Sequence, residues 1–280
     1  MAHKVALINM KGGVGKSTLA ANLAWAIASA PWHMNVLVID LDPQFNCSQY
    51  LVGVRRIESI ISDGRPTIWD IFEQNTVVPG MTDSTFDVWE TITRVYHSRN
   101  NENYIDLIPS RLELSHSLRN PTDKAQLLRR AVDVMEQDYD IVLIDCAPTE
   151  SVLTTAAYLV AEHLLIPVRP EFLSTIGLPL LEQSLNEFAS RYPGESPEIL
   201  GLVFNAISGY SPEETTSRTE VQRVARRSGW PVFDTEIGFS RSFPKSAREG
   251  QPVFRTSYVR YSTARRFHQF AREFAERIDL

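Results

Sequence analysis

The chain has 280 residues, of which 43% are hydrophobic, and a formal net charge of −6 at pH 7. This size and apolar content favour one α/β domain with a large core over two domains. No apolar run approaches the ~18 residues of a membrane span, which excludes a membrane-spanning protein. The two cysteines, Cys47 and Cys146, lack metal-ligand spacing, which excludes a disulfide scaffold and a zinc site. Because the N-terminus also lacks a signal peptide, a cytoplasmic protein is predicted.

The first predicted elements are a strand at 4–9 and a helix at 16–29, joined by a glycine-rich loop. Residues 8–18 read Ile-Asn-Met-Lys-Gly-Gly-Val-Gly-Lys-Ser-Thr. A strand, a glycine loop and a helix form the context of a phosphate-binding loop, in which glycines allow a tight turn that aims backbone N–H groups inward. Lys16 is predicted to reach the β- and γ-phosphates, and the Ser17 hydroxyl to hold Mg²⁺. The predicted nucleotide contacts of this loop are Gly12, Gly13, Val14, Gly15, Lys16, Ser17 and Thr18.

The loop departs from the strict phosphate-loop pattern at its start. Met10 stands where that pattern has its first glycine, and a second lysine, Lys11, follows at once. This departure resembles the deviant Walker A loop of the ParA/MinD family of ATPases, whose signature lysine occupies the same place. The resemblance implies that Lys11 reaches the nucleotide of a partner subunit in an ATP-sandwich dimer.

A second predicted strand, at 35–40, runs into Asp-Leu-Asp-Pro-Gln at 40–44 and resembles the second strand of ParA proteins. The resemblance implies that Asp40 assists the attack of water on the γ-phosphate. It also implies that the loop carrying Asp42 senses that phosphate. The match to the family is weakest at about 54–103, which is predicted to be a divergent or inserted segment.

The next predicted elements are a strand at 104–108, a helix at 123–137 and a strand at 140–145. The last of these ends at Asp145 and resembles the family's Walker B strand. A carboxylate at the end of a buried parallel strand lies at the edge of the sheet where ligands bind in open α/β folds. Asp145 is therefore predicted to hold the Mg²⁺ shell opposite Ser17.

Helices at 151–161 and 175–191 alternate with strands at 163–168 and 199–205. Asn205, at the end of the last of these strands, resembles the asparagine that reads adenine in the family. Alternating helices and mostly apolar strands predict an α/β fold: a doubly wound, mostly parallel sheet flanked by helices. With the deviant Walker A loop, this is the fold of a P-loop NTPase.

The C-terminal part of the chain is rich in arginine. Residues 1–217 carry 15 basic and 27 acidic side chains, whereas residues 218–280 carry 13 basic and 7 acidic ones. Helices are predicted at 213–228 and 259–277, and a strand at 231–235. An arginine surplus on an acidic protein favours a surface for an anionic partner, and the alternative is that these arginines pair within the chain. The predicted DNA-binding residues are Arg218, Arg223, Arg226 and Arg227.

The resemblance extends from about residue 4 to the C-terminus and implies one ParA-like ATPase domain over residues 1–280. The family's properties imply ATP and Mg²⁺ as cofactors, an ATP-dependent homodimer that binds DNA nonspecifically, and slow hydrolysis stimulated by a ParB-like or cargo-adaptor protein. The ATP state would then associate with the nucleoid. The alternatives are a MinD-like membrane-associated positioning ATPase, a reductase like the nitrogenase iron protein, and a metabolic enzyme such as dethiobiotin synthetase.

Overall fold

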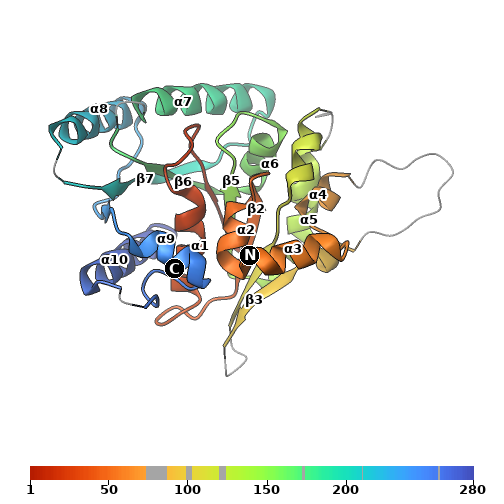
Figure 1. Ribbon diagram of the computed structural model, residues 1–280. Coiled ribbons are helices and arrows are strands. Elements are labelled where there is room, and N and C mark those ends of the chain that lie inside the picture. The colour runs from red at the N-terminus through yellow and green to blue at the C-terminus, as the bar shows by residue number, and fades with distance from the viewer. Residues whose placement is uncertain (74–86, 99–102, 120–123, 172–173, 210, 258) are drawn as a thin grey trace.

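The computed structural model describes residues 1–73, 87–98, 103–119, 124–171, 174–209, 211–257 and 259–280 (Figure 1). The strands are β1 (His3–Leu7), β2 (Val36–Leu41), β3 (Thr93–His97), β4 (Tyr104–Ile108), β5 (Ile141–Cys146), β6 (His163–Val168), β7 (Glu198–Ile207) and β8 (Ile237–Gly238). The α-helices are α1 (Lys16–Ile27), α2 (Asn46–Val52), α3 (Val54–Ser62), α4 (Ile68–Glu73), α5 (Ala125–Met135), α6 (Val152–Val160), α7 (Ser174–Arg191), α8 (Pro212–Ser228), α9 (Ser242–Glu249) and α10 (Tyr261–Arg277). In the described residues the 3₁₀ helices are η1 (Val88–Thr91), η2 (Leu112–Arg119) and η3 (Glu136–Asp138).

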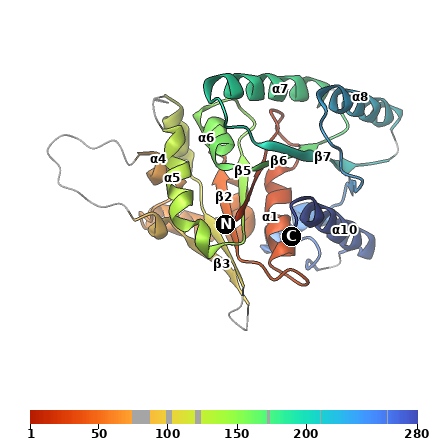
Figure 2. The ribbon, with the colours of Figure 1, turned by 180° about the vertical axis from the view of Figure 1, so that it is seen from behind.

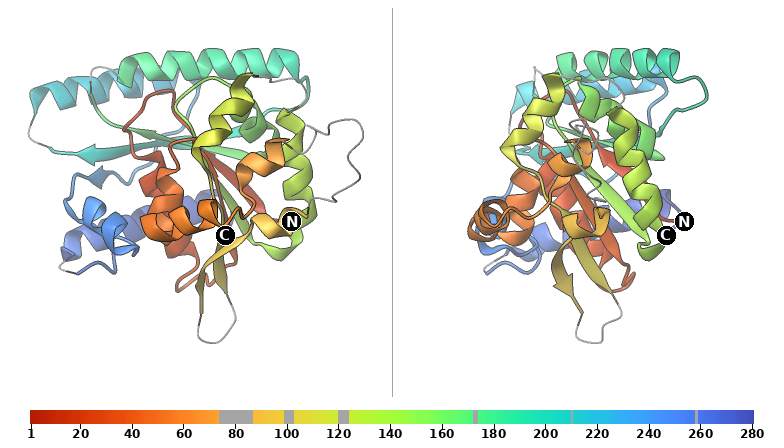
Figure 3. Two further views of the ribbon diagram at one scale, coloured as in Figure 1. Left: turned by 45° about the vertical axis from the view of Figure 1, so that its right-hand side comes forward. Right: turned by 90° about the vertical axis from the view of Figure 1, so that its right-hand side faces the viewer.

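The strands form one eight-stranded sheet in the order β3-β4-β2-β5-β1-β6-β7-β8. β3 runs antiparallel to β4 at one edge (Figure 3), and the other neighbouring pairs are parallel. The predicted doubly wound, mostly parallel α/β fold is confirmed. In this order β5 lies between β2 and β1, so the ends of the three central strands meet beside the loop that follows β1.

Helices cover both faces of the sheet, and successive strand residues point to opposite faces. Figures 1 and 2 show helices on both sides of the sheet. In β1, Ala6 belongs to the hydrophobic core that includes residues of α4 to α8, whereas Val5 and Leu7 belong to a second core that includes residues of α1, α2 and α10. Both sets are fully buried. This explains why the central strands are apolar without alternation: each face contributes to a separate hydrophobic core.

Several short elements differ from the sequence-based expectation. The strand predicted at 231–235 is wrong, because only Val232 forms a bridge, to Leu202, and the last strand is β8 at Ile237–Gly238. Pro231 has no N–H to donate to a ladder, which limits pairing there. The short helices α2, α3, α4 and α9 were not predicted.

The segment at 54–103, predicted to be divergent or inserted, is regular where the structure describes it. It forms α3 and α4, then η1 and the edge strand β3. Residues 74–86 and 99–102 lie outside the described residues. Edge strands need not be apolar on both faces, so β3 has a weaker sequence pattern than the central strands.

Candidate functional site

The loop between β1 and α1 turns on glycines with positive φ. Gly13 has φ 75° and Gly15 has φ 96°, conformations that side chains rarely adopt. Gly15 also caps the N-terminus of α1. A Cβ at Gly15 would overlap the amide nitrogen of Asn205, so glycine is required there by both conformation and space. The loop therefore places backbone N–H groups and the positive end of the helix dipole at one point.

The Lys16 ammonium lies inside this loop. It donates hydrogen bonds to the backbone oxygens of Asn9 (3.1 Å) and Lys11 (3.3 Å), and its side chain is buried. Burial lowers the pKa of Lys16, and the neighbouring carboxylate of Asp145 opposes that shift. Asn9, which the sequence analysis did not single out, organises the loop: its side chain accepts from the Lys11 N–H (2.9 Å) and donates to the carbonyl of Pro167 (2.8 Å).

Asp40 and Asp145 occupy neighbouring positions at the ends of β2 and β5, because the register pairs them directly. Asp40 accepts two hydrogen bonds from Ser48, at 2.8 Å from the backbone N–H and 2.7 Å from the hydroxyl, and one from the Asp42 N–H at 3.1 Å. Burial raises the pKa of Asp40 to about 7 despite these donors. Ser48, a second residue missed by the sequence analysis, therefore holds Asp40 in one orientation.

Asp145 differs from Asp40 in its surroundings. Both of its oxygens are buried, and neither accepts a hydrogen bond from the residues described. The Ser17 hydroxyl lies close enough to oppose the rise in the pKa of Asp145, but it does not meet hydrogen-bond geometry. Burial and then the charge of Asp40 raise the pKa of Asp145 well above its usual range.

An unpartnered buried carboxylate beside a hydroxyl is a donor set that suits Mg²⁺, which prefers oxygen ligands and keeps several waters and phosphate oxygens. Within the described part of the chain, no group of three or more His, Cys, Asp or Glu side chains forms a protein-only metal site. Ser17 and Asp145 fit a magnesium ion that the protein holds together with a phosphate ligand.

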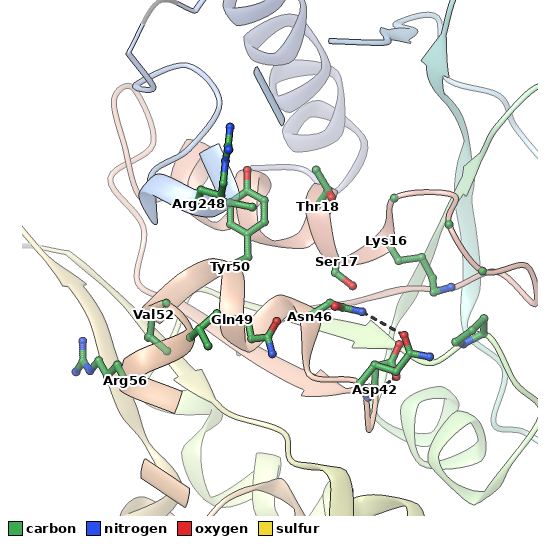
Figure 4. A pocket seen from close by; sticks show the side chains of 18 of the residues that line it. Lys16, Ser17, Thr18, Asp42, Asn46, Gln49, Tyr50, Val52, Arg56 and Arg248 are labelled. Atoms are coloured by element: carbon green, nitrogen blue, oxygen red, sulfur yellow. Dashed lines mark hydrogen bonds between the residues drawn. The ribbon is translucent and has the colours of Figure 1, made fainter. Parts of the chain in front are cut away.

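A pocket of about 960 Å³ opens beside the loop (Figure 4). Lys16, Ser17 and Thr18 from α1 line it together with Asp42, and Tyr50 and Arg248 stand at its other end. Gly12, Gly13, Gly15, Gln44, Arg55 and Arg56 also line it. The structure thus brings Asp42 and the predicted residues of the loop from Gly12 to Thr18, except the fully buried Val14, to one cavity large enough for a nucleotide.

Lys11 points away from that pocket toward the segment after β6. Its ammonium forms an ion pair with Glu171 at 2.8 Å, and Arg169 contacts the same carboxylate at 3.0 Å. The hydrogen bond from Lys11 lowers the pKa of Glu171. The predicted trans lysine is therefore held by its own protomer in this structure.

Asn205 lies behind the loop and is not among the residues that line the pocket. Its amide donates to the carbonyl of Val14 at 2.7 Å, and its side chain is buried against Gly15. In this conformation it supports the loop. Its assignment as the adenine reader stays a prediction.

The four arginines predicted to bind DNA are on α8, but three of them are paired with carboxylates. Arg218 pairs with Glu236, Arg223 with Glu220 at 2.5 Å, and Arg227 with Glu182 at 3.2 Å. Arg226 donates to the backbone carbonyl of Gln222 at 3.3 Å. Most of the arginines on α8 therefore fit the alternative interpretation, in which they pair with carboxylates of the same chain.

Two findings bear on the alternative functions. Cys47 and Cys146 are both buried as free thiols, and burial raises the pKa of each. Buried neutral thiols are poor nucleophiles and poor metal ligands. In the described residues, no helix has the length and apolar character needed to cross a membrane.

Comparison with known proteins places this site in a family. Residues 2–195 match the family model described as an AAA domain. An uncharacterized protein of Mycobacterium tuberculosis (strain H37Rv) is 31% identical and covers 100% of this chain and 80% of its own length. The chromosome-partitioning ATPase Soj of Treponema pallidum is 26% identical over 99% of this chain and 98% of its own. The structure of the Cyanothece McdA–ATP complex covers 98% of this chain and 96% of that chain, with a TM-score of 0.78 and 18% identity, which shows a shared fold.

Proposed function

The chain belongs to the AAA domain family, as a partition ATPase of the ParA/MinD type, and from this premise we propose that it is an ATP-driven switch that positions a cargo on DNA. The observation that carries the proposal is the combination of a phosphate loop with two buried strand-end carboxylates, Asp40 and Asp145, at one edge of the sheet. A loop alone binds phosphate, whereas the carboxylate pair adds what hydrolysis needs.

In the proposed ATP state, the backbone N–H groups of Gly12 to Gly15 surround the phosphates, and Lys16 moves from its carbonyl partners to the β- and γ-phosphates. Ser17 and Asp145 hold Mg²⁺, which neutralises charge on the phosphate oxygens. Asp40, oriented by Ser48, positions the attacking water. Because phosphoryl transfer depends mainly on positioning and electrostatics, hydrolysis stays slow until every group is aligned.

We propose that alignment requires a second copy of the chain. Lys11 leaves Glu171 and contacts the nucleotide of the partner subunit, so ATP joins two copies face to face. The closed dimer binds DNA without sequence preference and associates with the nucleoid. A ParB-like or cargo-adaptor protein then stimulates hydrolysis and releases the dimer.

The test is ATP turnover and nucleotide binding by the wild type and Lys16→Ala. We expect turnover far below the ~10 s⁻¹ typical of enzymes, dependent on Mg²⁺, and loss of nucleotide binding in the variant. Dimerisation with a non-hydrolysable ATP analogue and retention of DNA are measured on the same samples. Unchanged nucleotide binding by Lys16→Ala would reject the proposed site. Binding to liposomes and not to DNA would favour the membrane-associated alternative.

A further inference from the structure

Two groups of the C-terminal arginines differ in their partners. On α8, Arg218, Arg223 and Arg227 each contact a carboxylate. Neutralised pairs contribute little net potential at a distance, because the two charges cancel beyond the contact. Of the four arginines on α8 only Arg226 has no carboxylate partner among the described residues, so the face of α8 is a weak site for a polyanion.

The second group surrounds a pocket of about 770 Å³ between β8, α9 and the start of α10. Arg241, Lys245, Arg260 and Arg266 line it, and none of the lining residues is acidic. Among the residues that the structure describes, Arg241, Arg260 and Arg266 form no ion pair. Lys245 donates to the Ser257 carbonyl at 2.7 Å and lies 3.7 Å from Glu249. Three of the four cations thus lack a counter-charge from the described residues.

The rest of the pocket suits phosphate esters. The hydroxyl-bearing residues that line it, apart from Ser257, can donate to phosphate oxygens, and the first residues of α9 and α10 add the positive ends of two helix dipoles. The Ser257 hydroxyl already donates to Glu249 at 2.6 Å. Phe239 lines the same pocket and is 64% exposed, which gives an apolar ring beside the cations. The hydroxyl-bearing lining residues are Ser240, Ser242, Ser257, Ser262 and Thr263.

Helix α9 connects this pocket to the nucleotide site. Lys245 lines the basic pocket, and Arg248, one turn later, lines the nucleotide pocket. Between them, Ser246 is buried and hydrogen-bonded to the hydroxyl of Tyr50 on α2, the helix that follows the Asp40 and Asp42 loop. A movement of that loop on ATP binding can therefore reach the basic pocket through α2 and α9.

We propose that the pocket between β8, α9 and α10, and not the face of α8, binds the phosphates of DNA. This assignment rests on the DNA-binding step of the proposed function. Phosphate contacts carry no sequence information directly, so binding at this pocket is independent of sequence. In a dimer both copies present the pocket, which doubles the number of contacts.

The test compares two matched double variants in the full chain saturated with a non-hydrolysable ATP analogue. Arg260→Gln/Arg266→Gln removes two unpaired charges from the pocket, and Arg223→Gln/Arg227→Gln removes two paired charges from α8. Affinity for a mixed-sequence DNA duplex is measured by fluorescence anisotropy over a salt series. Each lost phosphate contact reduces the steepness of the plot of log K against log salt by about 0.9. The slope of the pocket variant should therefore be less steep by about 1.8 per protomer, and its affinity for DNA at least ~10-fold weaker. The α8 variant should keep the slope and the affinity of the wild type.

Duplex binding by the pocket variant equal to that of the wild type overturns the assignment, as does an equal loss in the α8 variant. Inorganic tripolyphosphate, titrated with Mg²⁺ in excess, distinguishes a free polyphosphate from DNA: if the pocket variant loses tripolyphosphate binding and keeps DNA binding, DNA is not the ligand. ATP turnover of each variant is measured in parallel. Normal turnover with an unchanged DNA affinity rejects only this inference, whereas absent turnover in the wild type rejects the proposed function.

Discussion

We predict that the ion pair between Lys11 and Glu171 within one protomer opposes dimerisation. The side chain of Lys11 is 17% exposed and that of Glu171 is 45% exposed, and their charged atoms are 2.8 Å apart. If Lys11 must reach the nucleotide of a partner subunit, each copy has to break this pair first. Replacing the carboxylate in Glu171→Gln removes the attraction and keeps the shape of the side chain.

The magnitude follows from the exposure of the pair. A half-exposed ion pair is screened by solvent and contributes about 0.5 kcal/mol. Two such pairs break in each dimer, so Glu171→Gln should favour the dimer by about 1 kcal/mol, which is roughly a fivefold lower dissociation constant. Lys11 has further interactions, so this figure concerns the one pair alone. The effect should grow at low ionic strength, where screening is weaker.

The assay is sedimentation or light scattering over a protein concentration series with a non-hydrolysable ATP analogue. Glu162→Gln is the matched control: Glu162 is also 45% exposed and pairs at 3.1 Å with Lys4, whose side chain is 13% exposed. The control should dimerise like the wild type. If Glu171→Gln dimerises no more tightly than the control, the ion pair does not oppose dimerisation and this reasoning is refuted.

Three further predictions concern the site and its support. Gly15→Ala should abolish binding of a fluorescent ATP analogue and lower the melting temperature by several degrees. A side chain at φ 96° costs about 1–2 kcal/mol, and the added Cβ would overlap Asn205. Unchanged binding of the analogue would contradict the loop geometry. Without nucleotide, Asp40→Asn should be stabilised against heat relative to the wild type, and by more near pH 8 than near pH 5. Burial raises the pKa of the Asp40 carboxyl to about 7 in the folded state, so the wild type loses stability as pH rises from the unfolded-state pKa of ~3.9 to that value. A stability difference that does not change with pH would refute this reasoning. Tyr50→Phe should lower the free energy of unfolding in urea by about 1–3 kcal/mol, since it removes the buried hydroxyl bonded to Ser246, and no change would show that the bond adds nothing.

The phosphate loop could be predicted from the sequence because its information is local. Glycines, a lysine and a hydroxyl residue stand at fixed offsets between an apolar strand and a helix, and the loop conformation follows from those few residues. The central strands were equally predictable, since burial on both faces makes each a continuous apolar run. Strand-end positions then identified Asp40 and Asp145 without knowledge of which strands are neighbours.

The weaker predictions involved segments with less local signal. The edge strand β3 pairs with β4 alone and is only partly buried, and the short helix α2 packs against both α1 and α9. Helices of seven or eight residues are not stable on their own, so their existence depends on tertiary packing. The expected strand at 231–235 failed because Pro231 has no N–H to donate, and pairing with β7 is limited to a single bridge between Val232 and Leu202.

The sequence by itself determined the fold class, the phosphate loop and the identity of the charged residues, because each depends on neighbours along the chain. Only the tertiary structure decided which charges meet. It placed β5 beside β2, so that Asp40 and Asp145 lie side by side, and it brought Glu171 to Lys11 across 160 residues of chain. It also paired three of the four arginines of α8 with carboxylates and left Arg241, Arg260 and Arg266 without one among the described residues. The energy of a charge depends on the groups within a few ångströms, and the packing of distant segments sets those distances.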